Sequence, residues 1–147
     1  MKTHREVLNK HKLTMLQKGA REVERTGINV IDIGIFRDNI NDYNNWQKCR
    51  YSGLIAHVVI NGVIQRGKWL ITRQGWEFLE GKKKLPVWVE VSDNHIVARA
   101  NKLIGVRDVY HGSEAIVTTF QYFIDETRLG YRPAARQSNQ MSLLGTR

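Results

Sequence analysis

The middle of the chain constrains the fold most, because it encodes a helix, a hairpin and a second helix with clear boundaries. Asn41 or Asp42 is suited to cap the first helix, since either side chain accepts a hydrogen bond from the first unpaired amides. Trp46 and Cys49 mark the side of this helix that faces the core. Gly53 supplies the left-handed residue that ends it. The sequence therefore predicts a short helix with one polar and one buried face.

A β-hairpin follows directly. Residues 54–60 read as a strand, and Asn61-Gly62 favours the type I′ turn that joins two antiparallel strands. The returning strand covers 63–71, with a bulge or bend expected at Gly67. A short helix over 73–80, capped by Thr72 and ended by Gly81, completes the series.

The N-terminal part predicts another helix. Thr3 and Glu6 match a capping box, and apolar residues recur at helical spacing over 4–25. The β-branched run at 28–36 fits either a short strand or the start of a brief second helix around 35–40. The sequence leaves these two alternatives open.

Beyond Pro86 the pattern changes. Residues 87–91 and 95–99 alternate as two strands around the turn Ser92-Asp93-Asn94. A segment from Ser113 predicts a helix with one apolar face, whose residues are Ile116, Phe120, Phe123 and Ile124. Residues 126–147 lack any apolar period and are predicted to form a flexible basic tail.

Two segments resemble a known family. The series Trp69-x-x-Thr72-x-x-Gly75-x-x-Phe78-Leu79 resembles the closing segment of MarR- and PadR-type repressors. The series Asn45-Trp46-x-Lys48-x-Arg50-Tyr51-x-Gly53-Leu54-Ile55 resembles their recognition helix. Over about residues 4–85 the chain is thus similar to the winged helix-turn-helix superfamily, and to small winged-helix proteins of phages and mobile elements.

This resemblance implies a winged helix-turn-helix, and the patterns beyond Pro86 add a C-terminal β-hairpin and helix, which together make an α+β fold. We expect a winged-helix domain over 1–85, a hairpin and helix extension of the same domain over 86–125, and the tail over 126–147.

The charge distribution favours a polyanionic partner. The formal net charge is +9, and residues 1–25 hold seven Lys and Arg against three Glu. Residues 126–147 hold four Arg against Glu126, which leaves the middle of the chain near neutral. Basic segments that neutralise phosphates release counterions and so gain affinity for nucleic acid.

The resulting hypothesis is sequence-preferring binding of double-stranded DNA, as a transcriptional regulator of a phage or mobile element. The first helix would enter the major groove, where Asn and Gln side chains match adenine and Arg and Lys match guanine. The hairpin would contact the backbone beside it. The predicted DNA-binding residues are Asn41, Asn44, Asn45, Gln47, Lys48, Tyr51, Gln65, Arg66, Lys68 and Arg73. A homodimer is expected, with a seam at 4–25 or 116–124.

Two alternatives remain open. A winged-helix protein-interaction module, such as a viral inhibitor or adaptor, would bind a host protein or a nucleic-acid-binding complex. It would use an exposed apolar patch at Phe120, Tyr122 and Phe123. An RNA-binding accessory protein fits the charge but lacks an aromatic RNA-binding strand motif.

Enzymatic chemistry is not predicted. The sequence holds no G-x-S-x-G, H-E-x-x-H or Walker A motif, so no cofactor is expected. Five dispersed histidines and the single Cys49 give no zinc spacing. A metal-binding set of Glu90, Asp93 and Asp108 is a minor alternative. The lone cysteine and the lack of a long apolar run predict no membrane and a cytoplasmic location, in the host cytoplasm if the element is viral.

Overall fold

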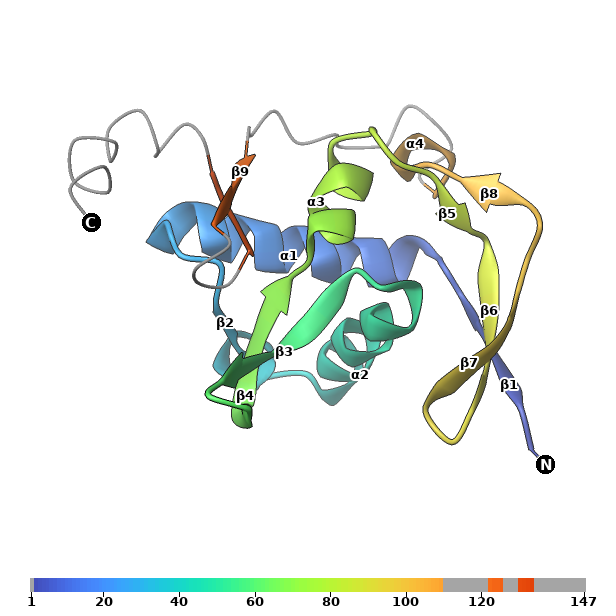
Figure 1. Cartoon of the computed structure of the whole chain (residues 1–147), viewed down its shortest axis with the longest axis horizontal. Coiled ribbons are helices and arrows are strands. Elements are labelled where there is room, and N and C mark those ends of the chain that lie inside the picture. The colour runs from blue at the N-terminus through green and yellow to red at the C-terminus, as the bar shows by residue number, and fades with distance from the viewer. Residues whose placement is uncertain (1, 110–121, 126–129, 134–147) are drawn as a thin grey trace.

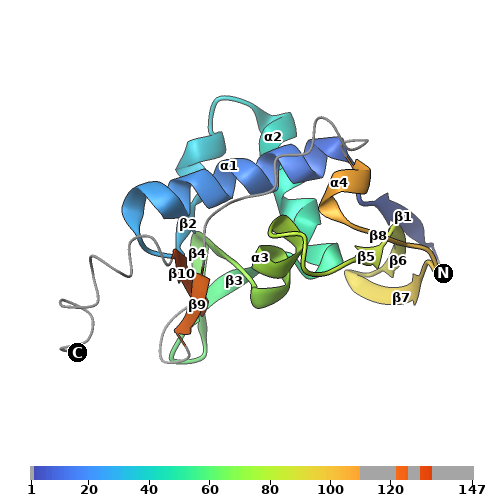
Figure 2. The same cartoon turned by 90° about the horizontal axis from the view of Figure 1, so that it is seen from above.

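The fold combines α-helices with small antiparallel β-sheets (Figure 1). The computed structural model describes residues 2–109, 122–125 and 130–133. Helix α1 (Lys10–Thr26) runs through the middle of the molecule, with α2 (Ile40–Lys48) on one side and α3 (Arg73–Leu79) on the other (Figures 1 and 2). The predicted mixture of helices and antiparallel strands is confirmed.

The start of the chain differs from the prediction. Strand β1 (His4–Val7) precedes α1, and Asn9 caps the helix by accepting a hydrogen bond from the Lys12 amide. The predicted capping box at Thr3 is wrong, because the Glu6 carboxylate pairs with the Lys12 ammonium at 3.0 Å instead of returning to a backbone amide. Gly27 ends α1 in the left-handed conformation, with φ of 76°.

A three-stranded sheet has the order β2-β4-β3. Strand β2 (Ile31–Asp32) pairs with β4 (Val63–Ile71), which also pairs with β3 (Ile55–Ile60). The 28–36 run thus contains a strand of two residues, followed by the 3-10 helix η1 (Ile33–Phe36). The run therefore contains both a short strand and a short helix, so each of the two alternatives holds in part.

The hairpin turn between β3 and β4 is confirmed. Asn61 and Gly62 have φ of 52° and 78°, and a positive φ at both central residues is what a type I′ turn requires. The register shifts between the pairs His57–Trp69 and Val59–Ile64, so a single β3 residue lies opposite residues 65–68 of β4. The extra residues are therefore on β4 around Gly67, as the predicted bulge or bend requires. Gly67 has φ of 72°, consistent with the predicted bend.

Helix α2 begins before the predicted caps. The Asn39 side chain accepts hydrogen bonds from the amides of Asn41 and Asp42, so neither of these residues is the cap. The helix continues into the 3-10 helix η2 (Cys49–Ser52), and Gly53 ends it with φ of 71°. Thr72 caps α3 as predicted, with its hydroxyl accepting from the Gly75 amide at 3.0 Å.

The second hairpin is also confirmed. Strands β6 (Trp88–Ser92) and β7 (His95–Arg99) pair with each other, and β6 also pairs with β1 in the order β1-β6-β7. This sheet joins the N-terminal residues to the segment after Pro86. Strands β5 (Leu85–Pro86) and β8 (Leu103–Ile104) form a further pair before the short helix α4 (Val106–Val109), none of which the sequence predicted.

The predicted C-terminal helix is wrong for the two residues of its apolar face that the structure describes. Phe123 and Ile124 lie in strand β9 (Tyr122–Asp125), which pairs with β10 (Gly130–Pro133). Pairing with a strand further along the chain overrides the helical spacing of the apolar residues. The rest of that predicted helix, with Ile116 and Phe120, lies outside the described residues, as does most of the predicted tail.

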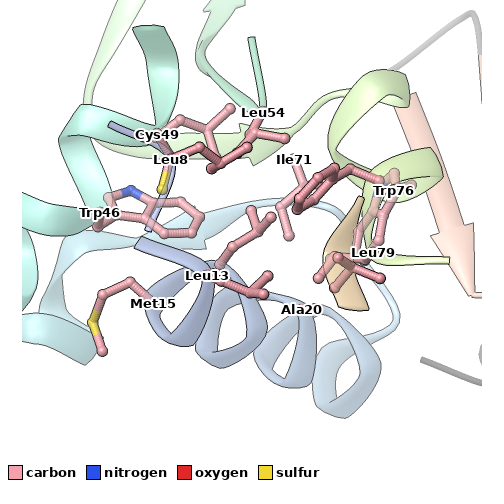
Figure 3. Close-up of a cluster of buried hydrophobic side chains, with 14 of the residues drawn as sticks. Leu8, Leu13, Met15, Ala20, Trp46, Cys49, Leu54, Ile71, Trp76 and Leu79 are labelled. Atoms are coloured by element: carbon pink, nitrogen blue, oxygen red, sulfur yellow. The ribbon is translucent and has the colours of Figure 1, made fainter. Parts of the chain in front are cut away.

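The core lies where α1, α2, the β2-β4-β3 sheet and α3 meet (Figure 3). Its largest fully buried side chains are Trp46, Trp69, Trp76, Phe36 and Phe78. The predicted burial of Trp46 is thus confirmed. Helices α1 and α2 approach closely at Gly19, where an added Cβ would lie 2.6 Å from Cζ3 of Trp46. The Trp46 ring therefore packs directly on the backbone of α1.

Candidate nucleic-acid interface

Helix α2 presents one stripe of exposed polar side chains. Asn41, Asn44 and Lys48 are all exposed, and their spacing of three and four residues places them on one helical face. Trp46 and Cys49 are buried on the opposite side. The predicted orientation of this helix is confirmed for Asn44, Lys48, Trp46 and Cys49. The stripe carries two amides, which both donate and accept hydrogen bonds, and one ammonium, which only donates.

Three other predicted site residues of this region, Asn45, Gln47 and Tyr51, are half-buried and so less accessible than the stripe. The Asn45 carbonyl accepts a hydrogen bond from the Cys49 thiol, and the Gln47 carbonyl accepts one from the Arg50 guanidinium. The Tyr51 hydroxyl donates to Asn94 Oδ1 at 2.9 Å. Tyr51 therefore links the end of α2 to the turn of the second hairpin, and Asn44 is a more accessible amide than Asn45.

The β3–β4 hairpin holds the next group of predicted residues. Arg66 is exposed, whereas the Gln65 side chain donates a hydrogen bond to the Val63 carbonyl at 3.0 Å. Lys68 forms an ion pair with Asp32 of β2. The hydrogen bond from Lys68 lowers the pKa of the Asp32 carboxyl, and the backbone amide of Gly34 adds to this effect. Arg66 is thus the freer of the two cations.

The sequence between Asp42 and Glu77 contains no Asp or Glu. This carboxylate-free segment forms most of α2, then η2, the β3–β4 hairpin and the first turn of α3. Its Lys and Arg residues are Lys48, Arg50, Arg66, Lys68 and Arg73. Arg73 is exposed at the start of α3. Lys48, Arg50 and Arg66 form no ion pair with any residue that the structure describes, so their positive charge is not compensated locally.

The tip of the β3–β4 hairpin is apolar, which the sequence reasoning missed. Val59, Ile60, Val63 and Ile64 are 50–61% exposed, on both sides of the Asn61-Gly62 turn. The signal was present as two pairs of aliphatic residues flanking the turn. The end of the hairpin therefore exposes these four aliphatic side chains to solvent.

Part of the positive charge near the N-terminus is neutralised within the protein. Lys12 is buried and paired with Glu6, and Arg25 pairs with Glu22 at 2.8 Å. These pairs leave the net charge of residues 1–25 unchanged, but they reduce the number of its cations that are available to a ligand.

The described residues include no cluster of three or more His, Cys, Asp or Glu side chains that could hold a metal ion. Of the minor alternative set, Glu90 pairs with Arg5, and Asp108 accepts a hydrogen bond from the Gly105 amide. Burial raises the pKa of the Cys49 thiol to about 12, so the reactive thiolate is suppressed.

Comparison of the chain with protein-family models, curated proteins and solved structures found no significant match. Within the described part of the chain, no helix has the length and apolar character needed to span a bilayer. The predicted apolar patch at Phe120, Tyr122 and Phe123 lies outside the residues whose side chains the structure describes.

Proposed function

We propose that the protein binds double-stranded DNA with sequence preference and regulates transcription, as a phage or mobile-element protein of winged-helix type would. The observation that carries the proposal is the exposed stripe of Asn41, Asn44 and Lys48 on α2, at the start of the carboxylate-free segment. Two amides and one uncompensated ammonium on one helical face suit the base edges and phosphates of a major groove.

The arrangement of the elements supports this proposal. Helix α2, the β3–β4 hairpin and α3 follow one another in the order expected of a winged helix-turn-helix. Helix α2 and the tips of both hairpins lie below α1 in the view of Figure 1, whereas α3 and α4 lie above it. A duplex approaching that side would meet α2, with the hairpins as additional contacts.

Sequence preference is the part of the proposal that one experiment can isolate. Selection from a random duplex pool should enrich one motif, and Asn44→Ala should weaken binding to it by about 1–3 kcal/mol while sparing mixed-sequence DNA. Asn101→Ala is the matched control, because Asn101 is exposed between β7 and β8. Failure to enrich any motif, or equal losses on both duplexes, would remove Asn44 from base recognition.

A second function is favoured by the apolar hairpin tip. A protein-interaction module would bury Val59, Ile60, Val63 and Ile64 against a partner protein, since exposed aliphatic groups of this kind mark interaction sites. A DNA-binding protein would instead insert them as a wedge into a minor groove.

The double substitution Ile60→Ser and Val63→Ser separates the two functions. If the tip binds a protein, the double variant no longer captures the partner polypeptide from nuclease-treated lysate. The Lys48→Ala variant still captures it. If the tip contacts DNA, both variants lose affinity for duplex in a purified system. Retention of full duplex affinity by the double variant would place the tip outside the DNA interface.

A further inference from the structure

A concave pocket lies beside the end of α2, bounded by η2, α3, β5 and the β6–β7 hairpin, with a volume of about 400 Å³. Its charged lining residues are Arg50, Lys83, Lys84 and Arg99, and no carboxylate of the described residues lines it. Leu85 and Ile96 contribute an apolar wall. The pocket is separate from the exposed stripe of α2, and none of its cations except Arg50 belongs to the carboxylate-free segment.

Arg50 is held in place by neutral partners. Its Nη1 donates to the Gln47 carbonyl at 3.0 Å, and its Nη2 donates to Tyr51 Oη at 2.7 Å and to Asn94 Oδ1 at 3.4 Å. These contacts use three of the five N–H donors of a guanidinium. The side chain is therefore oriented in advance, and two of its donors remain for a ligand.

The other three cations are exposed and form no ion pair with any described residue. Their neighbour Lys82 differs, because its ammonium pairs with Glu80 at 3.6 Å and it does not line the pocket. Gly81, with φ of 77°, turns the chain after α3 and brings Lys83 and Lys84 to the pocket. Four positive side chains thus surround one hollow, and no anionic side chain among the described residues balances them there.

We propose that this pocket binds a phosphate group. A phosphate offers several strong acceptor oxygens, to which guanidinium and ammonium groups donate charge-assisted hydrogen bonds. The apolar wall formed by Leu85 and Ile96 accommodates the uncharged body of the ligand that carries the phosphate. The ligand is either a free phosphomonoester or the phosphodiester backbone of a nucleic acid. The site does not depend on whether α2 binds DNA.

Calorimetric titration of the full chain at low salt tests the pocket with three probes: inorganic phosphate, adenosine monophosphate, and a short oligonucleotide without terminal phosphates. Arg50→Gln and Arg99→Gln should each weaken binding about tenfold, which corresponds to one charge-assisted hydrogen bond. Lys82→Gln is the matched control, since it removes an adjacent lysine that is already paired, and should stay within about twofold. Circular dichroism on each variant confirms folding.

Binding of adenosine monophosphate but not the oligonucleotide would identify a free phosphomonoester, and the reverse would identify a nucleic-acid backbone. Either result supports the site, provided that the pocket substitutions weaken it. If Arg50→Gln fails to fold, Arg99→Gln and Lys84→Gln carry the test, because both side chains are exposed. Absence of binding by all three probes would overturn the proposal, as would equal weakening by Lys82→Gln and Arg99→Gln.

Discussion

The Cys49 thiol lies in the core between α1 and α2, within hydrogen-bonding distance of the Lys12 and Asn45 carbonyls at 3.5 and 3.4 Å. Its complete burial raises the pKa of the thiol from 9.0 to about 12. We therefore predict no reaction with an aromatic disulfide reagent in the native state at pH 8, and rapid reaction after unfolding in urea. Fast modification of the native protein would show that the thiol is accessible.

The same pKa shift predicts a pH dependence of stability. Because the folded pKa is raised, the unfolded chain releases the proton first, and the thiol's contribution is fully present below about pH 9. It is lost between about pH 9 and 12, at up to about 1.4 kcal/mol per pH unit. Urea unfolding of wild type and Cys49→Ala at pH 8 and 10 isolates this effect from other titrating groups. Identical pH slopes in both proteins would contradict it.

A buried ion pair gives a second prediction for single residues. Lys12 is 4% exposed, and its ammonium contacts the Glu6 carboxylate at 3.0 Å and the Val7 carbonyl. Lys12→Met leaves that carboxylate with only His4 beside it, at 2.9 Å, among the described residues. We expect a loss of about 3–5 kcal/mol in the free energy of unfolding. Adding Glu6→Gln to Lys12→Met should recover much of the lost stability. If Lys12→Met alone were as stable as wild type, the ion pair would not contribute to stability.

Individual elements depend on a few close contacts, of which Gly19 is the sharpest. A methyl group there would meet the Trp46 ring at 2.6 and 2.8 Å, and the ring is fully buried. Alanine favours a helix over glycine by about 1 kcal/mol, but overpacking costs about 1–3 kcal/mol. We predict that Gly19→Ala destabilises the fold despite the gain in helix propensity.

Thermal and urea unfolding measure this balance. Gly105→Ala serves as the control, because its added methyl would meet Lys84 Cγ only at an ordinary 3.6 Å. It should change the free energy of unfolding by less than about 0.5 kcal/mol. A stabilising Gly19→Ala would mean that α1 and α2 are further apart than the structure shows.

Elements with local signals were predictable from the sequence. The Asn61-Gly62 turn, the Thr72 cap and the alternating strands around Asp93-Asn94 each depend on residues only a few positions apart. Strand β1 escaped prediction because its partner β6 is distant in the sequence: the paired residues Arg5 and Glu90 are separated by 85 positions. Tertiary pairing of this kind overrides local helix signals.

The candidate interface was predictable to a similar extent. With Trp46 assigned to the core, helical spacing correctly predicted that Asn44 and Lys48 face the solvent. The half-burial of Tyr51 was not predictable, because its partner Asn94 is 43 residues away. The same holds for Lys68, whose partner Asp32 is 36 residues away. Distant partners decide which polar side chains remain available for a ligand.

For the whole molecule, the position of the positive charge matters more than its total. The net charge is +9, yet Lys12, Arg25 and Lys68 are paired within the protein. Lys48 and Arg66, the exposed cations of the carboxylate-free segment without an ion pair to a described residue, are therefore expected to dominate contact with a polyanion. Each phosphate contact adds about 0.9 to the slope of log affinity against log salt concentration.

The most direct measurement is the salt dependence of duplex binding, followed by fluorescence anisotropy for wild type and two double variants of equal charge. Lys48→Ala with Arg66→Ala should weaken binding to every duplex and reduce the salt slope by about two. Lys102→Ala with Arg107→Ala, which removes exposed charges outside the segment, should leave the slope nearly unchanged. Equal effects of the two double variants, or no salt-dependent binding by the wild-type protein, would contradict the proposed interface.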